Sequence, residues 1–176
     1  LRADEATLFR RYGSEGGRLW RLARGDDRRR VTPSHPVKSI SNETTFDEDI
    51  SDEATLAPIL WRLCEKVAWR LKQSGLASGS ITLKLKTAEF RIVTRARSGL
   101  PPTQLAIRIH EVAHQLLLPE LKGVRYRLIG VAAADLRPAE EADRGDLVDT
   151  DVKREIAAAE AVDRLRAKFG RAAVIR

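Results

Sequence analysis

The sequence predicts an α+β fold in which the elements follow the order β-α-β-β-α-β, so that two helices cover one face of a four-stranded sheet. Three observations predict this fold. Residues 81–97 alternate apolar and polar side chains in two arms joined by a short link. Two segments, 51–74 and 103–118, carry apolar residues at helical spacing. Two more segments rich in β-branched residues, 37–46 and 123–134, supply the outer strands.

Composition places the chain among globular proteins with an anionic partner. Its 176 residues are 43% hydrophobic and 32% charged, and the net charge is +7. The single cysteine, Cys64, excludes an internal disulfide and fits a reducing compartment. No apolar run approaches the ~20 residues of a membrane span, so we expect a cytoplasmic protein without a membrane partner. A first residue Leu1 and the absence of methionine suggest a piece of a longer protein.

The N-terminal residues form a separate segment. Residues 1–25 are predicted to be helical, because apolar residues recur at helical spacing, with a break at Gly13 and at Gly16 and Gly17. Residues 26–36 are polar, contain two prolines and lack periodicity, which is typical of a linker. The predicted domain then covers residues 37–134.

The first strand and first helix of this domain have clear boundaries. The strand 37–46 is expected to end at the acidic residues 47–49. Ser51 or Asp52 is placed to cap a helix that runs to Ser74 and stops at Gly75. The buried stripe of this helix is predicted to hold Leu56, Leu60, Leu63, Val67 and Leu71, with Cys64 and Ala68 beside it.

The predicted hairpin has one apolar and one basic face. Ile81, Leu83 and Leu85 alternate with Lys84 and Lys86 in the first arm, and residues 87–89 form the link. In the second arm Phe90, Ile92, Thr94 and Ala96 are expected on the apolar face, and the cations Arg91, Arg95 and Arg97 are expected to share the face of the lysines. Because like charges repel, the arrangement favours a polyanionic partner. An ordinary solvated face that protects an edge strand is an equally good interpretation of the hairpin alone.

The rest of the domain repeats the pattern. Residues 98–102 read as a loop, and Thr103 is expected to cap the second helix. In the fourth strand Tyr126 and Leu128 are expected to point one way, and Arg125 and Arg127 to join the basic face. No aromatic side chain is expected on that face, which favours contact with backbone phosphates over base stacking.

Residues 135–151 are predicted to form an acidic linker, and residues 152–176 to form a C-terminal helix and tail.

A five-residue motif in the second helix points to different chemistry. His110, Glu111 and His114 match the H-E-x-x-H pattern, in which two histidines one helical turn apart share zinc and the glutamate acts as a base. The only other histidine is His35, in the linker, and a catalytic zinc needs a third protein ligand. A zinc hydrolase is therefore a remote alternative, and we predict no metal site in this chain.

Five stretches together resemble one protein family. The stretches VKSISNETTFDEDI, LWRLCEKVAWRLK, ITLKLKTAEFRIVTRAR, VRYRLIGV and RLRAKFGRAAVIR are similar, in this order, to the C-terminal part of the bacterial Y-family translesion DNA polymerases of the DNA polymerase IV type. The resemblance implies that residues 37–134 are the little finger domain, whose sheet holds primer–template duplex DNA. It also implies that residues 1–25 are the end of the thumb.

The resemblance implies roles for individual residues. DNA contact is implied for Lys38, Ser39, Ser41, Lys84, Lys86, Arg91, Arg95, Arg97, Arg125 and Arg127. A sliding-clamp contact is implied at Leu147 and Val148, although this stretch lacks the glutamine and the aromatic residue of the usual clamp motif. Catalytic residues and the Mg²⁺ ions of nucleotidyl transfer belong to the palm of such enzymes, which this chain lacks. We therefore expect no cofactor here, and DNA binding without synthesis.

A second function remains open from the sequence. The same domain could belong to an accessory protein of this family that has lost polymerase activity and serves as a platform for protein interactions. Only the region that would precede this chain can separate the two, because a palm with its paired carboxylates identifies a polymerase.

Overall fold

The computed structural model describes residues 3–32, 36–144, 151–170 and 173–174. Two compact units divide the chain between Pro36 and Val37. The helices and strands are α1 (Glu5–Leu22), β1 (Ile40–Ile50), α2 (Glu53–Gln73), β2 (Leu76–Thr87), β3 (Ile92–Thr103), α3 (Ala106–Leu117), β4 (Tyr126–Pro138) and α4 (Asp151–Phe169), with short 3-10 turns at Leu118–Glu120 and Ala139–Glu141. The predicted β-α-β-β-α-β order is confirmed.

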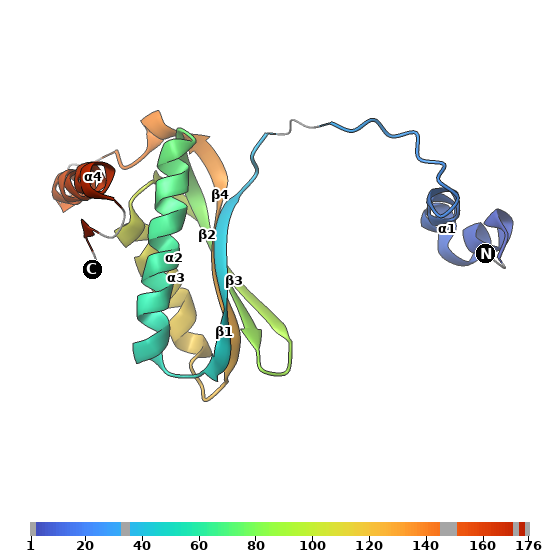
Figure 1. Ribbon diagram of the computed structural model, residues 1–176, viewed down its shortest axis with the longest axis horizontal. Coiled ribbons are helices and arrows are strands. Elements are labelled where there is room, and N and C mark those ends of the chain that lie inside the picture. Colours follow the sequence, from blue (N-terminus) through green and yellow to red (C-terminus); the bar gives the residue numbers. More distant parts are fainter. Residues whose placement is uncertain (1–2, 33–35, 145–150, 171–172, 175–176) are drawn as a thin grey trace. The chain divides into compact units, whose positions relative to one another are not determined.

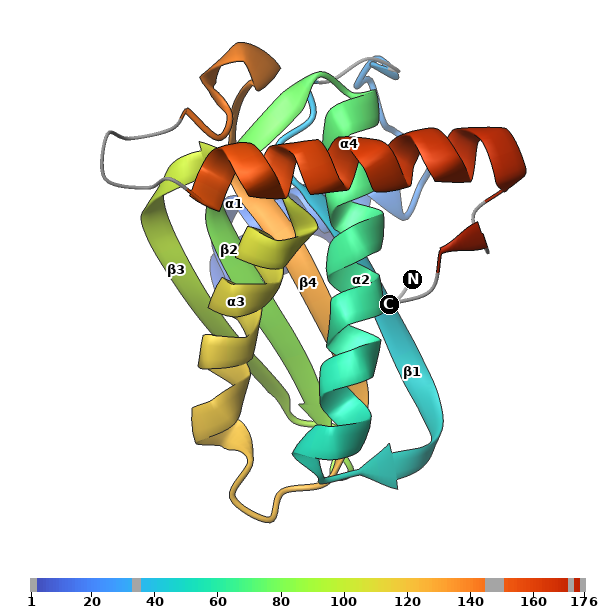
Figure 2. The same cartoon turned by 90° about the vertical axis from the view of Figure 1, so that its left-hand side faces the viewer.

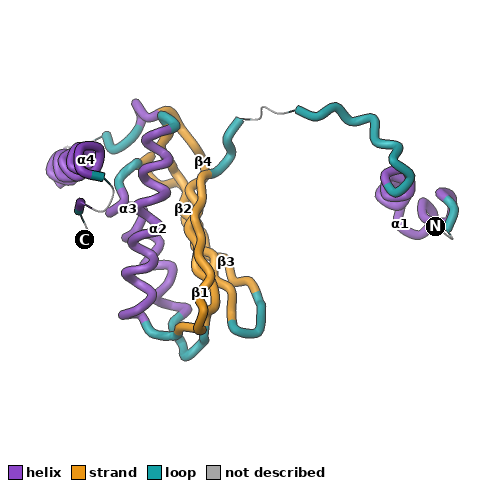
Figure 3. The backbone as a smooth tube through the Cα atoms, in the orientation of Figure 1, coloured by secondary structure: helices purple, strands orange, loops and turns teal. Residues whose placement is uncertain are grey.

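The four strands form one sheet in the order β1-β4-β2-β3, and every neighbouring pair is antiparallel. The connection through α2 joins β1 to β2 across β4, and the connection through α3 joins β3 to β4 across β2. Figure 1 shows α2 and α3 side by side on one face of the sheet. Within this unit no described element covers the other face, which we call the open face (Figure 3).

The core lies between the sheet and these two helices. The side chains of α2 predicted to be buried are all buried, at 0 to 4% exposure. They pack against Ile81, Leu83 and Leu85 of β2 and against Ile109 and Leu117 of α3. Because each of these apolar side chains is removed from water, truncating one costs about 2–5 kcal/mol. Burial also raises the pKa of the Cys64 thiol well above its ordinary value, as expected for a core cysteine.

Helix α2 has the predicted boundaries for the predicted reasons. The Asp52 carboxylate accepts a hydrogen bond of 2.7 Å from the backbone N–H of Thr55, which satisfies one of the free donors at the helix start. Hydrogen bonding from Thr55 lowers the pKa of the Asp52 carboxyl. The helix ends at Ser74, and Gly75 follows with φ of 63°, a left-handed conformation suited to glycine.

Several predicted boundaries are wrong. The fourth strand runs from Tyr126 to Pro138 rather than over residues 123–134, so it includes the start of the predicted linker 135–151. Strand β1 continues past residue 46 to Ile50, because an irregularity after Thr45 lets Ile50 pair with Tyr126. The predicted loop 98–102 is part of β3. Thr103 ends β3 rather than capping α3, whose N-cap is Leu105. The Thr103 hydroxyl still accepts a hydrogen bond of 3.0 Å from the backbone N–H of Leu105.

The N-terminal unit is a helix with a sharp break at the predicted glycine. Gly13 has φ of 63° inside α1, which splits the helix into two segments. A side chain at Gly16 would lie 2.1 Å from the carbonyl oxygen of Leu8, so only glycine permits this close approach. The indole N–H of Trp20 donates a hydrogen bond of 3.1 Å to the carbonyl of Ala3.

Helix α4 lies over the helical layer of the second unit. Figure 2 shows it crossing α2 and α3. Ion pairs join it to that layer, at 2.5 Å between Lys72 and Asp163 and at 2.8 Å between Glu65 and Arg166. Val152, near the start of α4, is buried. Among the helices described, none is long and apolar enough to cross a membrane.

Candidate nucleic-acid interface

The open face is built from rows of side chains that run across the sheet. Directly paired residues share a face, so the register places each row unambiguously. The rows are Ser41, Ala132, Thr82 and Ala96; Glu43, Gly130, Lys84 and Thr94; and Thr45, Leu128, Lys86 and Ile92. Two of the lysines predicted to form the basic face are therefore confirmed on it.

Small side chains form the middle of this face. Ser41, Ala132, Thr82 and Ala96 make one complete row, and Gly130 stands at the centre of the next. Gly130 is buried because Glu43 leans over it, and an added Cβ would lie 2.7 Å from the Cβ of Glu43. Small side chains let a large ligand approach the sheet closely, with longer side chains in the next rows positioned to hold it.

Cations stand on the open face toward the β2–β3 turn. The Lys84 ammonium lies 2.8 Å from the Glu43 carboxylate, so part of its charge is neutralised within the sheet. Lys86 stands one row farther along, opposite Ile92. Arg127 is the extra residue of an irregularity in β4, where Thr87 pairs with Tyr126 and Lys86 pairs with Leu128. Its guanidinium lies 4.0 Å from the ring of Phe90.

The same irregularity corrects one prediction. Tyr126 and Leu128 were expected to share a face, but Tyr126 is buried among the core residues and Leu128 belongs to the open face. An extra residue in one strand changes the phase of the side chains that follow it. The Tyr126 hydroxyl donates a hydrogen bond of 2.9 Å to the carbonyl of Glu120, and burial raises the pKa of this hydroxyl.

The face predicted for Arg95 and Arg97 is wrong. Leu83 pairs with Arg95 and Ile81 pairs with Arg97, so both arginines project on the helix-covered side of the sheet. The Arg95 guanidinium lies 2.8 Å from the Glu120 carboxylate. Arg97 donates a hydrogen bond of 2.6 Å to the Gln115 side-chain carbonyl. These two cations therefore tie the edge strand to α3 and the turn that follows it.

The remaining predicted contact residues lie at the margins of the sheet. Lys38 and Ser39 are exposed just before β1. Arg91 is exposed between the hairpin turn and β3. Arg125 is exposed just before β4, with its guanidinium 3.9 Å from the Asp49 carboxylate. These residues add positive charge around the open face without forming a single cluster on it.

Sequence reasoning missed an aromatic residue next to this face. Phe90 was placed on the apolar side of the hairpin, yet it lies in the turn, exposed and in contact with Lys86 and Arg127. Ile92, also assigned to the apolar side, is exposed on the open face. The signal that could have found both is the predicted link itself, because three residues, 87–89, would pair Lys86 with Phe90 and so put Phe90 and Ile92 on the face of the lysines. In the structure five residues separate Lys86 from its partner Ile92, which gives the same face.

Comparison with known proteins identifies the domain that presents this face. Residues 37–147 match the impB/mucB/samB family C-terminal domain. This chain belongs to that family. The match begins at the boundary between the two compact units and includes every strand of the sheet.

Curated relatives agree with the family assignment. The chain is 48% identical over 171 residues to DNA polymerase IV of Brucella melitensis, 47% identical over 171 residues to DNA polymerase IV 1 of Mesorhizobium japonicum, and 44% identical over 173 residues to DNA polymerase IV of Caulobacter vibrioides. These matches cover 97%, 97% and 98% of this chain, but 38%, 39% and 43% of the relatives. The chain thus spans about two-fifths of their length, and its resemblance to the C-terminal part of such polymerases is confirmed.

The H-E-x-x-H motif of this family member does not form a metal cluster. Nowhere in the described part of the chain do three or more His, Cys, Asp or Glu side chains gather to hold a metal ion. His114 instead hydrogen bonds to Glu53 of α2 at 2.9 Å, and the His110 ring stacks on it with centroids 5.5 Å apart. Partial burial, and the neighbouring His114, lower the pKa of His110.

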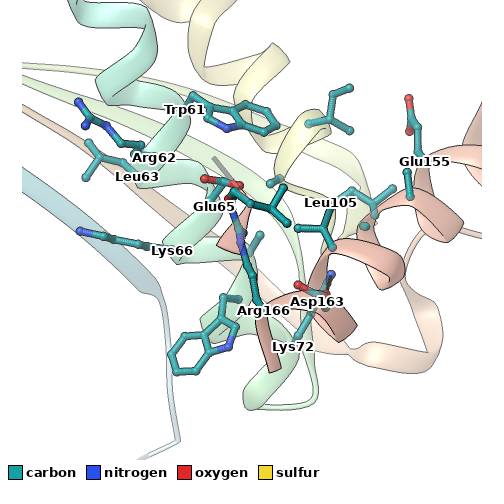
Figure 4. Close-up of a pocket in the computed structure, with 18 of the residues that line it drawn as sticks. Trp61, Arg62, Leu63, Glu65, Lys66, Lys72, Leu105, Glu155, Asp163 and Arg166 are labelled. Carbon is teal, nitrogen blue, oxygen red and sulfur yellow. Dashed lines mark hydrogen bonds and ion pairs between the residues drawn. The ribbon is translucent and has the colours of Figure 1, made fainter. Parts of the chain in front are cut away.

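A pocket lies on the helical side of this family domain. It has a volume of about 1400 Å³ and lies between α2, α3 and α4. Figure 4 shows Trp61 and Leu105 at its wall, and the pairs Glu65–Arg166 and Lys72–Asp163 beside it. Because both signs of charge line it, this pocket does not continue the basic surface of the open face.

The predicted clamp-contact residues, Leu147 and Val148, lie outside the described residues, so the sliding-clamp contact stays a prediction.

Proposed function

We propose that this chain is the DNA-holding C-terminal part of an error-prone translesion polymerase, and that its open face grips the phosphates of duplex DNA. The observation that supports the proposal most directly is the open face itself. It is a helix-free sheet surface with one complete row of small residues, with Lys84 and Lys86 in the next two rows and Arg127 beside Lys86. The relatives named DNA polymerase IV supply the context.

The mechanism is contact with the DNA backbone. Lysine and arginine side chains neutralise phosphates, and small hydroxyl groups such as those of Ser41 and Thr82 donate hydrogen bonds to phosphate oxygens. Such contacts position a duplex without reading its sequence. This tolerance suits a polymerase that must accept damaged templates, because a lesion changes a base and leaves the backbone in place.

The chemistry of synthesis is assigned to other parts of the polymerase. Nucleotidyl transfer requires paired carboxylates that hold Mg²⁺ ions, and we place these in the palm that would precede this chain. Here the open face supplies affinity and register for the primer–template. Arg95 and Arg97 are left out of the proposed contact surface, because they face α3 and not the open side.

The test is a salt series with two duplexes. Binding of the chain to a fluorescent primer–template is compared with binding to a duplex of scrambled sequence. If about five phosphates are neutralised, the logarithm of the association constant falls with the logarithm of salt concentration with a slope of about −4.5. Equal affinities for both sequences and a steep slope support the proposal. A slope near zero refutes it. A strong preference for one sequence would show that the chain recognises base edges rather than the backbone alone.

A further inference from the structure

An exposed phenylalanine occupies the turn of the β2–β3 hairpin. Phe90 is 61% exposed, and its φ of 66° is a left-handed conformation that disfavours bulky side chains. Backbone bonds close the turn: the N–H of Thr87 donates to the carbonyl of Arg91, and the N–H of Phe90 donates to the carbonyl of Thr87, each at 2.9 Å. None of these bonds uses the ring, and glycine or asparagine would adopt the same φ with less strain. Folding therefore does not explain a phenylalanine at this position.

Two cations of the open face lie against the ring. The guanidinium carbon of Arg127 is 4.0 Å from the ring centroid, and the Lys86 ammonium is 4.8 Å from it. Both distances are within the range in which the electron-rich ring attracts a cation. Ile92, which pairs with Lys86, is 62% exposed. The end of the hairpin thus combines exposed apolar surface with positive charge held close to it.

This combination fits one class of ligand. Surfaces that bind single-stranded nucleic acid join cations, which hold the backbone, to aromatic rings, on which the bases stack. A base inside a duplex is stacked on both sides and offers only its edges in the grooves. The ring therefore suits a base that has no pairing partner. Figure 3 shows the turn end of the hairpin bending away from the helices. The ring lies against Lys86, which stands on the open face.

We propose that Phe90 is a stacking platform for an unpaired nucleobase, with Lys86 and Arg127 holding the phosphates that flank that nucleotide. The inference rests on the proposed function, because the single strand is taken to be the one that continues from the duplex on the open face. It adds a contact that duplex binding does not need. The chain then distinguishes a junction between single and double strands from a plain duplex.

The experiment compares two DNAs that differ only in an unpaired segment. One is a DNA hairpin with a single-stranded 5′ overhang that carries 2-aminopurine, whose fluorescence falls when the base stacks. The other is the same hairpin with a blunt end. The wild-type chain is expected to bind the overhang DNA more tightly than the blunt DNA and to quench the probe. Phe90→Ala is expected to weaken overhang binding about 5- to 150-fold, the range found for removing one base–aromatic stack. Binding of the blunt DNA should not change.

Three further variants keep the result interpretable. Phe90→Asn suits the left-handed backbone, so it should be at least as stable as the wild type in urea unfolding while losing the overhang preference. Phe90→Trp should retain the preference and the quenching. Ile92→Ala removes a neighbouring side chain of similar exposure that has no ring, and it should keep both signals.

The outcomes separate this inference from the proposed function. If Phe90→Ala and Phe90→Asn bind the overhang DNA as tightly as the wild type does, stacking is overturned. If the wild type binds the blunt duplex with a steep salt slope but gains nothing from the overhang, the stacking inference alone fails. If neither DNA binds, both the proposed function and this inference fail.

Discussion

The two faces of the sheet use positive charge in opposite ways. On the open face, Lys86 and Arg127 have exposed apolar surface beside them, and neither forms an ion pair with a carboxylate of the described residues. On the helix-covered side, Arg95 is paired with Glu120 and Arg97 with Gln115. Cations on the two faces of the same sheet thus serve different purposes. Those on the covered side hold elements of the protein together. On the open side Lys84 is paired with Glu43, while Lys86 and Arg127 remain available to an anionic ligand.

The largest expected difference between the faces concerns stability. Leu83 is fully buried on the covered side, and Lys84, the next residue, stands on the open face. Leu83→Ala should lower the free energy of unfolding by about 2–5 kcal/mol, because it leaves a cavity in the core. Lys84→Ala should change it by less than about 0.5 kcal/mol, as is typical of surface positions. Urea unfolding of both variants measures the contrast, and equal losses would contradict the assignment of faces.

The next contrast concerns DNA affinity. Lys84→Ala with Lys86→Ala removes two open-face cations, and the slope of the salt series should flatten by about 1 to 2, because Glu43 already neutralises part of the Lys84 charge. Arg95→Ala with Arg97→Ala removes the same amount of charge from the covered side and should leave the slope unchanged. The second pair should instead lower stability modestly, since it releases the contacts with α3. Equal flattening by both pairs would mean that DNA also contacts the covered side.

A smaller effect is expected from the acidic partners. Glu43→Gln removes the carboxylate that pairs with Lys84 and so frees one more cation for phosphate. The salt slope should steepen by about 1, and affinity at low salt should rise. Glu120→Gln is the matched control, because it removes the partner of Arg95 on the other side. If both changes alter DNA binding equally, net charge and not position governs the affinity.

The smallest expected effect is a pH dependence confined to the helical layer. Burial lowers the pKa of His110, so the unfolded chain binds a proton there more readily than the folded chain does. Stability from this residue is therefore fully present above about pH 6.5 and declines as pH falls below it. The groups around it are Trp61, His114 and, through His114, Glu53.

Thermal unfolding of the wild type and of His110→Phe between about pH 5 and pH 7.5 isolates this term. The wild type should lose more stability than the variant on acidification, because phenylalanine keeps the ring packing without a titrating group. Parallel pH profiles for the two proteins would show that His110 does not contribute.

The sequence sufficed for the order of elements, because that order depends on periodicities that each segment displays on its own. Alternation in β2 and the stripe of α2 both report burial correctly. The alternation in β3 shows that successive side chains point to opposite faces of the sheet. It does not show which of the two sets faces the helices. The pairing of Leu83 with Arg95 depends on the turn, and Ile92 and Ala96 are exposed although they are apolar. Register is a property of two strands together, so inspection of one strand could not supply it.

The part of the candidate site that could be predicted consists of charged residues whose face follows from the alternation within a single strand. Lys84 and Lys86 follow directly from the alternation in β2. The place of Arg127 depends on an extra residue in β4, and the exposure of Phe90 depends on a left-handed turn residue. Neither feature has a signal in the composition of its segment. Glycine or asparagine would have marked the turn, and a phenylalanine there conceals it.

The strand order has a consequence for synthesis of the chain on the ribosome. Strand β1 leaves the ribosome before the rest of the sheet, yet its only partner in the sheet is β4, the last strand to be made. Until β4 emerges, the edge of β1 has nothing to pair with and is open to other chains. The strand contains Glu43, Asp47, Glu48 and Asp49, and charges of one sign discourage two copies from pairing. We therefore expect the acidity of β1 to limit pairing between nascent chains during the interval before the sheet can close.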